Sequence, residues 1–361
     1  MGEKWGTVLF TFKTPSLCDG LSAVERTGDS LWLANDETTS LERLQIGKAT
    51  DTGTIACNEH RVFPLREFLN LPVKQDDTEI DIEGLAYDAH EGYLWLTGSH
   101  SLKRKKADAD KPAHKNIKRL ATVEADGNRY LLARIPVVVE DDRHALADKV
   151  DSDGRSAAQL RGDDTGNELT AAIAEDEHLR DFLRIPGKDN GFDIEGLAVN
   201  GPRLLLGLRG PVLRGWAVVL EIEPEQDKNS PGTLRLKPIG PDGRPYRKHF
   251  FDLEGLGVRD LCWQGDDLLV LAGPTLDLDG PVTVFRWRGA LASDEESVVF
   301  PDQLEKVLEV PFGKGDDHAE GLCLYEPGDG TGAVLLVVYD AAAEQRKQGA
   351  TGVEGDLFVI N

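Results

Sequence analysis

Cysteine is scarce in this chain, and long apolar runs are missing. The four cysteines, Cys18, Cys57, Cys262 and Cys323, lie far apart and form no C-x-x-C pair. We therefore expect reduced, mostly buried thiols rather than disulfides or zinc ligands. No stretch approaches the roughly 20 apolar residues of a membrane span. The first residues include an early acidic side chain and only a short apolar run, unlike a secretory signal. We expect a cytoplasmic location.

Positive charge is also in deficit. The chain has 41 Lys and Arg residues against 64 Asp and Glu residues, a formal net charge of −23. A summed field of this sign repels polyanions, so we expect neither nucleic acid nor a membrane as a partner. A local basic patch can still bind a small anion. The expected partner is therefore a small anionic ligand or another protein, and the oligomeric state stays open.

Motifs of several enzyme classes are absent as well. No G-x-S-x-G, P-loop, H-E-x-x-H or G-x-G-x-x-G stands in a suitable context. This argues against a nucleophilic-serine hydrolase and against a nucleotide-binding fold.

The chain does contain a repeated phrase, Glu-Gly-Leu. It begins at Glu83, Glu195, Glu254 and Glu320, with a degenerate copy at Asp19. A short apolar run typical of a β-strand follows each copy, and the 38 glycines and 18 prolines indicate many turns. Three intervals between copies are 64, 59 and 66 residues, whereas Glu83 and Glu195 are 112 residues apart. The phrase therefore marks a repeat of about 60 residues.

Residues 141–184 account for the long interval. They are charged and Ala-rich, and they contain a helix-like pattern from Asn167 to Leu183 in which Asn167 is the N-cap. Without this 44-residue segment the interval shortens to 68 residues. We interpret the segment as a helical insertion in the second unit. The alternative is a diverged sixth unit within residues 101–185.

The two ends of the chain together supply one more period. In a β-propeller an N-terminal strand often completes the last blade, so we expect residues 5–12 to pair with residues 355–360. We predict about four strands in each unit. Those of the second and third units are 83–87, 93–97, 117–123, 129–139, and 195–199, 203–208, 216–222, 233–239. The prediction is one all-β domain over residues 1–361, a five-bladed β-propeller, or alternatively a six-bladed one, closed by its terminal strands.

The acidic residues of the phrase would meet at the channel, because the first strand of each blade lines it. Five carboxylates near one axis repel, so some must be protonated, paired or bound to a cation. Ca²⁺, which takes about six to eight oxygen ligands, would resolve this conflict. The alternative is an architectural role, with each carboxylate accepting backbone N–H groups of the next blade. The predicted metal ligands are Asp19, Glu83, Glu195, Glu254 and Glu320.

Loops at one end of the channel add basic residues and histidines. We predict acid or base roles for the histidines and charge stabilisation by the cations. The candidate catalytic residues are His100, Lys103, Arg209 and His318. The candidate substrate-binding residues are Arg104, Lys188, Arg214, Asp277 and Asp279. The alternatives are structural histidines and a solvated hairpin tip at residues 103–106.

Three parts of the sequence carry a resemblance to a known family. Residues 185–198, residues 207–216, and residues 251–261 followed by 271–280 resemble the bacterial family catalogued as domain of unknown function 3616. This resemblance covers almost the whole chain and implies no catalytic residues. The Glu-Gly-Leu phrase alone is similar to phrases in esterase-like phytases, in SdiA-regulated proteins and in five-bladed calcium-activated apyrases. Those similarities imply phosphoester chemistry or a metal-centred propeller.

Two functions follow from these observations. The first is a metal-dependent hydrolase of a phosphoester or another small anion, with the metal among the glutamates activating water. The second is a non-enzymatic scaffold propeller with a structural channel cation, which would contact partners through residues 141–184. The Arg and His residues gathered on the carboxylate face favour hydrolysis.

Overall fold

The chain is built almost entirely of β-strands. The structure, a computed structural model, describes residues 2–49, 53–74, 79–292, 294–328, 330 and 332–360. Two short α-helices, α1 (Ala113–Leu120) and α2 (Glu168–Ile173), stand among the strands of these ranges. Within the same ranges, no helix combines the length and apolar character needed to cross a membrane. All four cysteines are free thiols, as expected.

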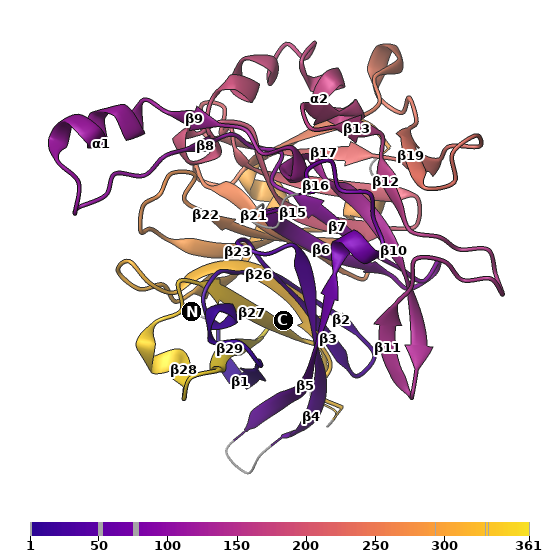
Figure 1. Cartoon of the computed structure of the whole chain (residues 1–361), viewed down its shortest axis with the longest axis vertical. Helices are drawn as coiled ribbons and strands as arrows, with labels where there is room; N and C mark the ends of the chain where they lie inside the picture. Colours follow the sequence, from indigo (N-terminus) through magenta and orange to yellow (C-terminus); the bar gives the residue numbers. More distant parts are fainter. Residues whose placement is uncertain are drawn as a thin grey trace.

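Five groups of antiparallel strands follow one another along the chain (Figure 1). The first contains β2 (Leu21–Thr27), β3 (Ser30–Asn35), β4 (Ser40–Ala49) and β5 (Thr54–Pro64). The second contains β6 (Ile82–Asp88), β7 (Tyr93–Gly98), β10 (Leu132–Glu140) and β12 (Ala158–Leu160). The third contains β15 (Asp193–Asn200), β16 (Arg203–Gly210), β17 (Trp216–Ile222) and β20 (Arg247–Asp252). The fourth contains β21 (Gly257–Gln264), β22 (Asp267–Gly273), β23 (Val282–Trp287) and β25 (Leu304–Val310). The fifth contains β26 (His318–Tyr325), β27 (Val334–Asp340), β29 (Gly352–Val359) and β1 (Lys4–Thr11).

The first strands of the five groups lie side by side in a cycle. β2 packs beside β6, β6 beside β15, β15 beside β21, β21 beside β26, and β26 beside β2. Equivalent positions of these strands therefore come together around one axis.

The second strand of each group is buried on both faces. In β3, Leu31 and Leu33 pack toward the fifth group, whereas Trp32 and Ala34 pack toward the second. Side chains of a strand alternate between its two faces, so a strand covered on both sides needs a continuous apolar run. This requirement explains the apolar run that follows each copy of the repeated phrase. Each such Leu stabilises the fold by about 1.5–3 kcal/mol.

The two ends of the chain pair with each other. β1 runs antiparallel to β29, from Lys4 opposite Phe358 to Thr11 opposite Gly352. The pairing expected for residues 5–12 and 355–360 is thus present. β1 also pairs in parallel with β5, which joins the first and fifth groups into one sheet.

Residues 141–184 contain less helix than expected. α2 begins as predicted at Asn167, whose side chain accepts the N–H of Thr170 at 3.0 Å, while the Thr170 hydroxyl accepts the N–H of Asn167 at 2.8 Å. The helix ends at Ile173 because the Asp176 carboxylate accepts the N–H groups of His178 and Leu179 and so starts a new turn. The segment also supplies β12 to the second group.

One predicted strand is wrong, and another belongs to a different group. Residues 117–123 begin inside α1 rather than in a strand, and the third strand of the second group is β10. Residues 233–239 include β19 (Thr233–Leu236), which pairs with β12 of the second group. The fourth strand of the third group is β20. Residues 117–120 are helical and have no buried side chain, whereas Leu234 and Leu236 of β19 are buried against the second group.

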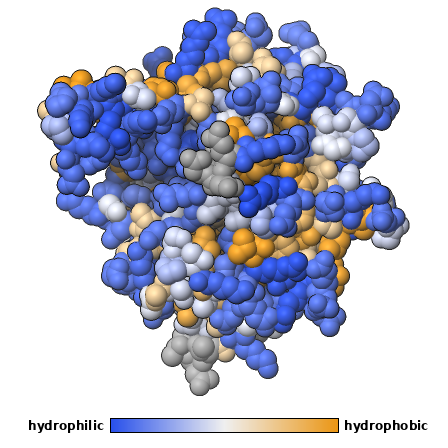
Figure 2. Space-filling view, viewed as in Figure 1, coloured by the Kyte–Doolittle hydropathy of each residue, from blue (hydrophilic) through white to orange (hydrophobic). Residues whose placement is uncertain are grey.

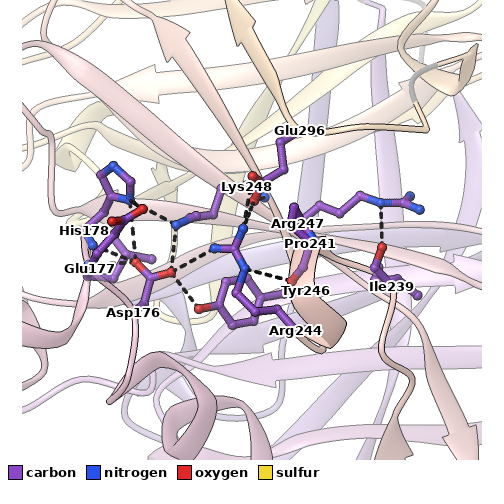
Figure 3. Close-up of polar contacts among 11 residues, drawn as sticks. Asp176, Glu177, His178, Ile239, Pro241, Arg244, Tyr246, Arg247, Lys248 and Glu296 are labelled. Atoms are coloured by element: carbon purple, nitrogen blue, oxygen red, sulfur yellow. Dashed lines mark hydrogen bonds and ion pairs between the residues drawn. The ribbon is translucent and has the colours of Figure 1, made fainter.

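The Asp176 carboxylate ties the segment around α2 to the third group (Figure 3). Its Oδ2 accepts hydrogen bonds from Lys248 Nζ and from the Tyr246 hydroxyl, both at 2.7 Å. Burial would raise the pKa of Asp176, but these donors and the N–H of His178 outweigh burial and lower it to about 2. Lys248 is itself buried, so its ammonium depends on this partner. The segment is therefore part of the packed body.

Candidate functional site

Each first strand has a shift in pairing register that leaves one of its residues without a direct partner, and β15 has a second shift, between Asp193 and Ile194. In four of the five strands, the residue at the shift has an ionisable side chain. The five residues are Ser22, Glu83, Glu195, Arg259 and Glu320. A β-bulge of this kind redirects a side chain locally. Because the five strands form a cycle, these side chains meet near the common axis.

Asp19 and Glu254 do not belong to this set. Asp19 precedes β2 and pairs with Lys347 at 2.9 Å, and its side chain is 56% exposed. Glu254 lies in the turn before β21 with a φ of 60°, and it pairs with Lys306 at 2.7 Å. The prediction that these two residues begin first strands is therefore wrong.

Ser22 and Arg259 take the two positions instead. With them, the three intervals of ordinary length become 61, 64 and 61 residues, more even than those between the copies of the phrase. The sequence did not reveal Arg259 because the repeat was aligned on its acidic residue. A copy of the phrase occurs by coincidence five residues before Arg259. The evenness of the spacing was the signal that would have found it.

Two arginines neutralise the carboxylates near the axis. Arg209 Nη1 donates to Glu195 Oε1 at 2.7 Å. Arg259 Nη1 lies 3.1 Å from Glu195 Oε2 and 2.7 Å from Glu320 Oε1. The loop after β22 orients both guanidinium groups, because Arg209 Nε donates to the carbonyl of Thr275 and Arg259 Nη2 to that of Pro274, each at 3.0 Å. Paired arginines thus resolve the repulsion that sequence analysis assigned to a bound cation.

The three glutamates have different pKa values. Burial would raise the pKa of Glu195, but Arg209 and Arg259 outweigh burial and lower it. Burial raises the pKa of Glu320 to about 8, with Arg259 opposing the shift and the charge of Asp340 reinforcing it. Burial raises the pKa of Glu83 well above its ordinary value, and nearby carboxylates add to the shift. At pH 7, Glu195 is therefore ionised, whereas Glu320 is mainly a carboxylic acid.

A cavity of about 470 Å³ opens beside this network. Its charged and titratable lining residues are Lys106, Lys188, Arg209, Arg259, Asp277, Asp279, His318, Glu320 and Asp340. Apolar side chains of Leu276, Leu278 and Phe312 line it as well. Of the predicted catalytic and substrate-binding residues, the structure brings Lys188, Arg209, Asp277, Asp279 and His318 together here.

Lys188 is the cation in the cavity that is best placed to meet an anion. Burial and Arg209 oppose its charge, but the carboxylates of Glu320, Asp277 and Glu195 outweigh them and raise the pKa of Lys188. Among the residues that the structure describes, no side chain hydrogen-bonds or ion-pairs with its amino group. An ionised, unpaired lysine in a cavity is a ready partner for an anion.

His318 forms a pair with Asp279 at the cavity wall. Its Nε2 lies 3.2 Å from Asp279 Oδ1, which also accepts the N–H of Gly315 at 2.9 Å. These two donors lower the pKa of Asp279 below its ordinary value. The ionised carboxylate therefore favours the tautomer of His318 with its proton on Nε2, and Nδ1 is left with its lone pair.

His100 does not reach the cavity. It is buried, its Nδ1 donates to the carbonyl of Gly98 at 2.8 Å, and its Nε2 accepts from the Asn167 amide at 2.7 Å. Burial lowers the pKa of His100 to about 4, so the ring is neutral and supports the cap of α2. Its role in the fold is structural.

Lys103, Arg104 and Arg214 also lie outside the cavity lining. Lys103 pairs with Glu79 at 2.6 Å, and Arg104 pairs with Asp189 at 2.7 Å. Arg214 is exposed in the turn between β16 and β17, with a φ of 53°. These residues were predicted for the site because they come soon after the expected strands in sequence. Their local ion pairs and turns hold their side chains away from the cavity.

Calcium fits this donor set poorly. The described ranges contain no group of three or more His, Cys, Asp or Glu side chains arranged to hold a metal ion. Of the five expected ligands, Glu83, Glu195 and Glu320 converge, and the last two already accept hydrogen bonds from arginines. Ca²⁺ prefers about six to eight oxygen ligands, and a protonated carboxyl is a poor one. The chemistry of the cavity is therefore assigned to the chain's own side chains.

Glu195 and Glu254 belong to copies of the same phrase, but only Glu195 is buried in the network. Replacing each of them should therefore lower the free energy of unfolding by different amounts. Replacing Glu195→Gln leaves two buried guanidinium groups without their shared anion, so we expect the free energy of unfolding to fall by about 3 kcal/mol. Glu254→Gln removes an exposed ion pair, so the loss should stay below about 1 kcal/mol. Urea unfolding at pH 7 measures both. Equal losses for the two variants would contradict the assignment of Glu195 to the network.

Melting temperatures with and without calcium test whether a metal ion stabilises the protein. We expect the melting temperature of the purified protein to be the same in excess calcium and in excess chelator, because arginines occupy the position of the cation. A calcium site filled at a hundredfold excess over its Kd would instead stabilise the native state by about 2.7 kcal/mol. A rise in melting temperature with calcium, reversed by chelator, would restore the metal-centred hypothesis.

Several solved structures match the chain at low sequence identity and low TM-score. An oxidoreductase (glucose dehydrogenase) from Thermus thermophilus is 13% identical, with 99% of each chain covered and a TM-score of 0.39. The Cps50 (Swd1) β-propeller domain of Myceliophthora thermophila is 10% identical over 98% of this chain and 100% of that one, with a TM-score of 0.33. Hydrazine synthase of Kuenenia stuttgartiensis is 9% identical over 91% of this chain, with a TM-score of 0.33, and this chain covers 57% of its length. TM-scores below 0.5 carry no argument about activity.

Sequence comparison gives a family without an assigned function. No curated protein matches the chain. A family model matches it from residue 20 to residue 356, which includes every strand that lines the cavity. The chain therefore belongs to the family described as "Protein of unknown function (DUF3616)".

Proposed function

We propose that this chain is a five-bladed β-propeller that binds a small anionic substrate at one end of its channel and hydrolyses a phosphoester or related bond in it. One observation carries the proposal: a single cavity contains the carboxylic acid Glu320, the His318–Asp279 pair and the unpaired Lys188. The five antiparallel groups, the cycle of first strands and the β1–β29 pairing support the blade count.

Binding would depend mainly on Lys188. Its amino group meets the anion directly, because Arg209 and Arg259 already donate to Glu195, Glu320 and the loop carbonyls. The two arginines still add a positive field to this wall of the cavity.

The acid and the base of the reaction would come from the same strand, β26. His318 Nδ1 accepts a proton from water as the water oxygen attacks phosphorus, and Asp279 stabilises the resulting imidazolium. The bond from phosphorus to the leaving oxygen breaks, and Glu320 gives that oxygen its proton. Lys188 offsets the negative charge that gathers on the transferring group. Return of the proton from His318 to Glu320 through solvent resets the site.

A non-enzymatic binding module is the second candidate. The segment around α2 was the expected contact element, but Leu169 and Ile173 of this helix are fully buried. The exposed helix is α1, which has no buried residue among its eight. That exposure favours a contact role for α1, whether or not the cavity has catalytic activity.

A panel of small phosphoesters tests the hydrolase. We expect turnover without added metal and a decrease in kcat of about 100-fold or more in His318→Gln, since a positioned base contributes on this order. Lys188→Ala should mainly raise KM. His90→Gln, which alters an exposed histidine, is the matched control and should keep full activity. Binding of anions with no turnover of any ester would leave the binding module as the function.

The pH dependence of anion affinity tests the role of Glu320. Its pKa of about 8 lies above the ordinary value, so the side chain is neutral below pH 8 and becomes negative as the pH rises past it. Sulfate keeps its charge throughout, and we expect its affinity to fall by about tenfold between pH 7 and pH 9 because a new negative charge faces it. Titration calorimetry measures this change. Glu320→Gln should remove the step, and a step that survives in this variant would assign it to another group.

A further inference from the structure

Residues 103–124 form a projecting arm, called the basic arm below. β8 (Lys103–Arg104) and β9 (Val123–Glu124) pair at its base, and α1 extends outward from the body at the upper left of Figure 1. None of the eight residues of α1 is buried. The helix therefore gains nothing from packing against the rest of the chain.

The basic arm reverses the charge of the molecule locally. It contains eight Lys and Arg residues and three Asp and Glu residues, a net charge of +5 in a chain of −23, so the remainder carries −28. Lys105 and Lys111 pair within the arm, with Glu124 and Asp108. In the described part of the chain, no side chain pairs with the amino groups of Lys106, Lys115 or Lys118. Those three cations are free for a partner.

Large apolar side chains are exposed along the same surface. On the arm, Ile117 is 70% exposed and Leu120 is 47% exposed. At the cavity, Leu278 is 64% exposed and Phe312 is 46% exposed. Figure 2 shows the face of the arm as mostly hydrophilic, with hydrophobic atoms among the polar ones. Exposed apolar groups bordered by charges mark an interaction surface.

Lys106 connects the arm to the proposed active site. It belongs to the arm and also lines the cavity, together with Lys188, Leu278 and Phe312. A molecule that lies along α1 therefore has one end at the cavity.

We propose that the basic arm docks an acidic segment of a polypeptide and presents a phosphorylated side chain of that segment to the cavity. Lys115 and Lys118 pair with its carboxylates, and Ile117 receives an apolar side chain. Lys106 and Lys188 meet the phosphate. This inference rests on the proposed function, since it names the substrate class for the same cavity.

Charge complementarity selects a short polypeptide over other polyanions. A bilayer or a long nucleic acid extends well beyond the arm and meets the acidic remainder of the molecule, which repels it. A segment of about ten residues contacts the arm alone. Ile117 and Leu120 are also better partners for an apolar side chain than for a sugar-phosphate backbone.

A synthetic acidic peptide with one Leu and one phosphoserine tests the proposal against the full chain. Fluorescence anisotropy would compare this peptide with its unphosphorylated form, and calorimetry would measure inorganic phosphate. We expect Lys115→Glu combined with Lys118→Glu to weaken phosphopeptide binding by about tenfold or more and to leave the affinity for inorganic phosphate unchanged. Ile117→Ser should also weaken peptide binding alone. Lys188→Ala should weaken both, and Lys149→Glu, an exposed lysine outside the arm, should change neither.

Each result separates the docking proposal from the proposed function. Because α1 has no buried residue, the arm variants leave the core intact. If phosphate binds and the arm variants have no effect on the peptide, the docking proposal fails and the function stands. If neither phosphate nor phosphopeptide binds, both fail. If the arm variants instead weaken binding to vesicles with anionic lipid or to an RNA oligonucleotide, the assignment of a polypeptide partner is overturned.

Discussion

The carboxylate of Glu195 between Arg209 and Arg259 is the interaction on which the rest of the site depends. Glu195, Arg209 and Arg259 come from β15, β16 and β21, and Glu320 of β26 contacts Arg259 as well, so three neighbouring sheets meet at one anion. Burying any of these charges alone would cost several kcal/mol, and the shared pairing offsets that cost only while all of them stay in place. The arginines also hold the carbonyls of Thr275 and Pro274 in the loop that forms a wall of the cavity. Stability near the axis and the shape of the cavity therefore depend on the same hydrogen bonds.

This pairing also divides the carboxyl groups into two kinds. Glu195 contacts both arginines and stays ionised, whereas Glu320 contacts one arginine and faces the charge of Asp340, so burial prevails and its pKa rises to about 8. Glu83 has no arginine among the main groups that shift its pKa, and burial together with nearby carboxylates raises that pKa well above the ordinary value. Three residues from the same repeated phrase thus differ in protonation because their neighbours differ. Burial alone can therefore raise the pKa of a glutamate enough for it to act as an acid at neutral pH, without a change of residue type.

Sequence patterns predicted the parts of this architecture that local chemistry determines. The buried second strands, the pairing of the terminal strands and the Asn167 cap all follow from the residues at those positions. The register of the first and fourth units does not, because a bulge accepts Ser22 or Arg259 as readily as a glutamate, and similarity of residue type then points to Asp19 and Glu254. The charge balance could not be predicted for the same reason: protonation, pairing and a bound cation were all open for five carboxylates, and the structure has a serine and an arginine at two of the five positions. The length of α2 was unpredictable from periodicity, because the turn at Asp176 depends on Lys248 and Tyr246, some 70 residues away in sequence.

Because the chain as a whole is acidic, its few clusters of basic residues differ in sign from the surrounding surface. In a molecule of net charge −23, an anion is repelled at most of the surface, and the basic arm, with a net charge of +5, is an exception. At physiological ionic strength the field of a charge decays over about 8 Å, so a segment that touches only the arm is screened from most of the acidic body. A larger anionic surface pressed against the same face meets that body within the screening distance. In the docking proposal, the same charge distribution that repels extended polyanions admits a short one, which Lys106 would connect from the arm to the cavity.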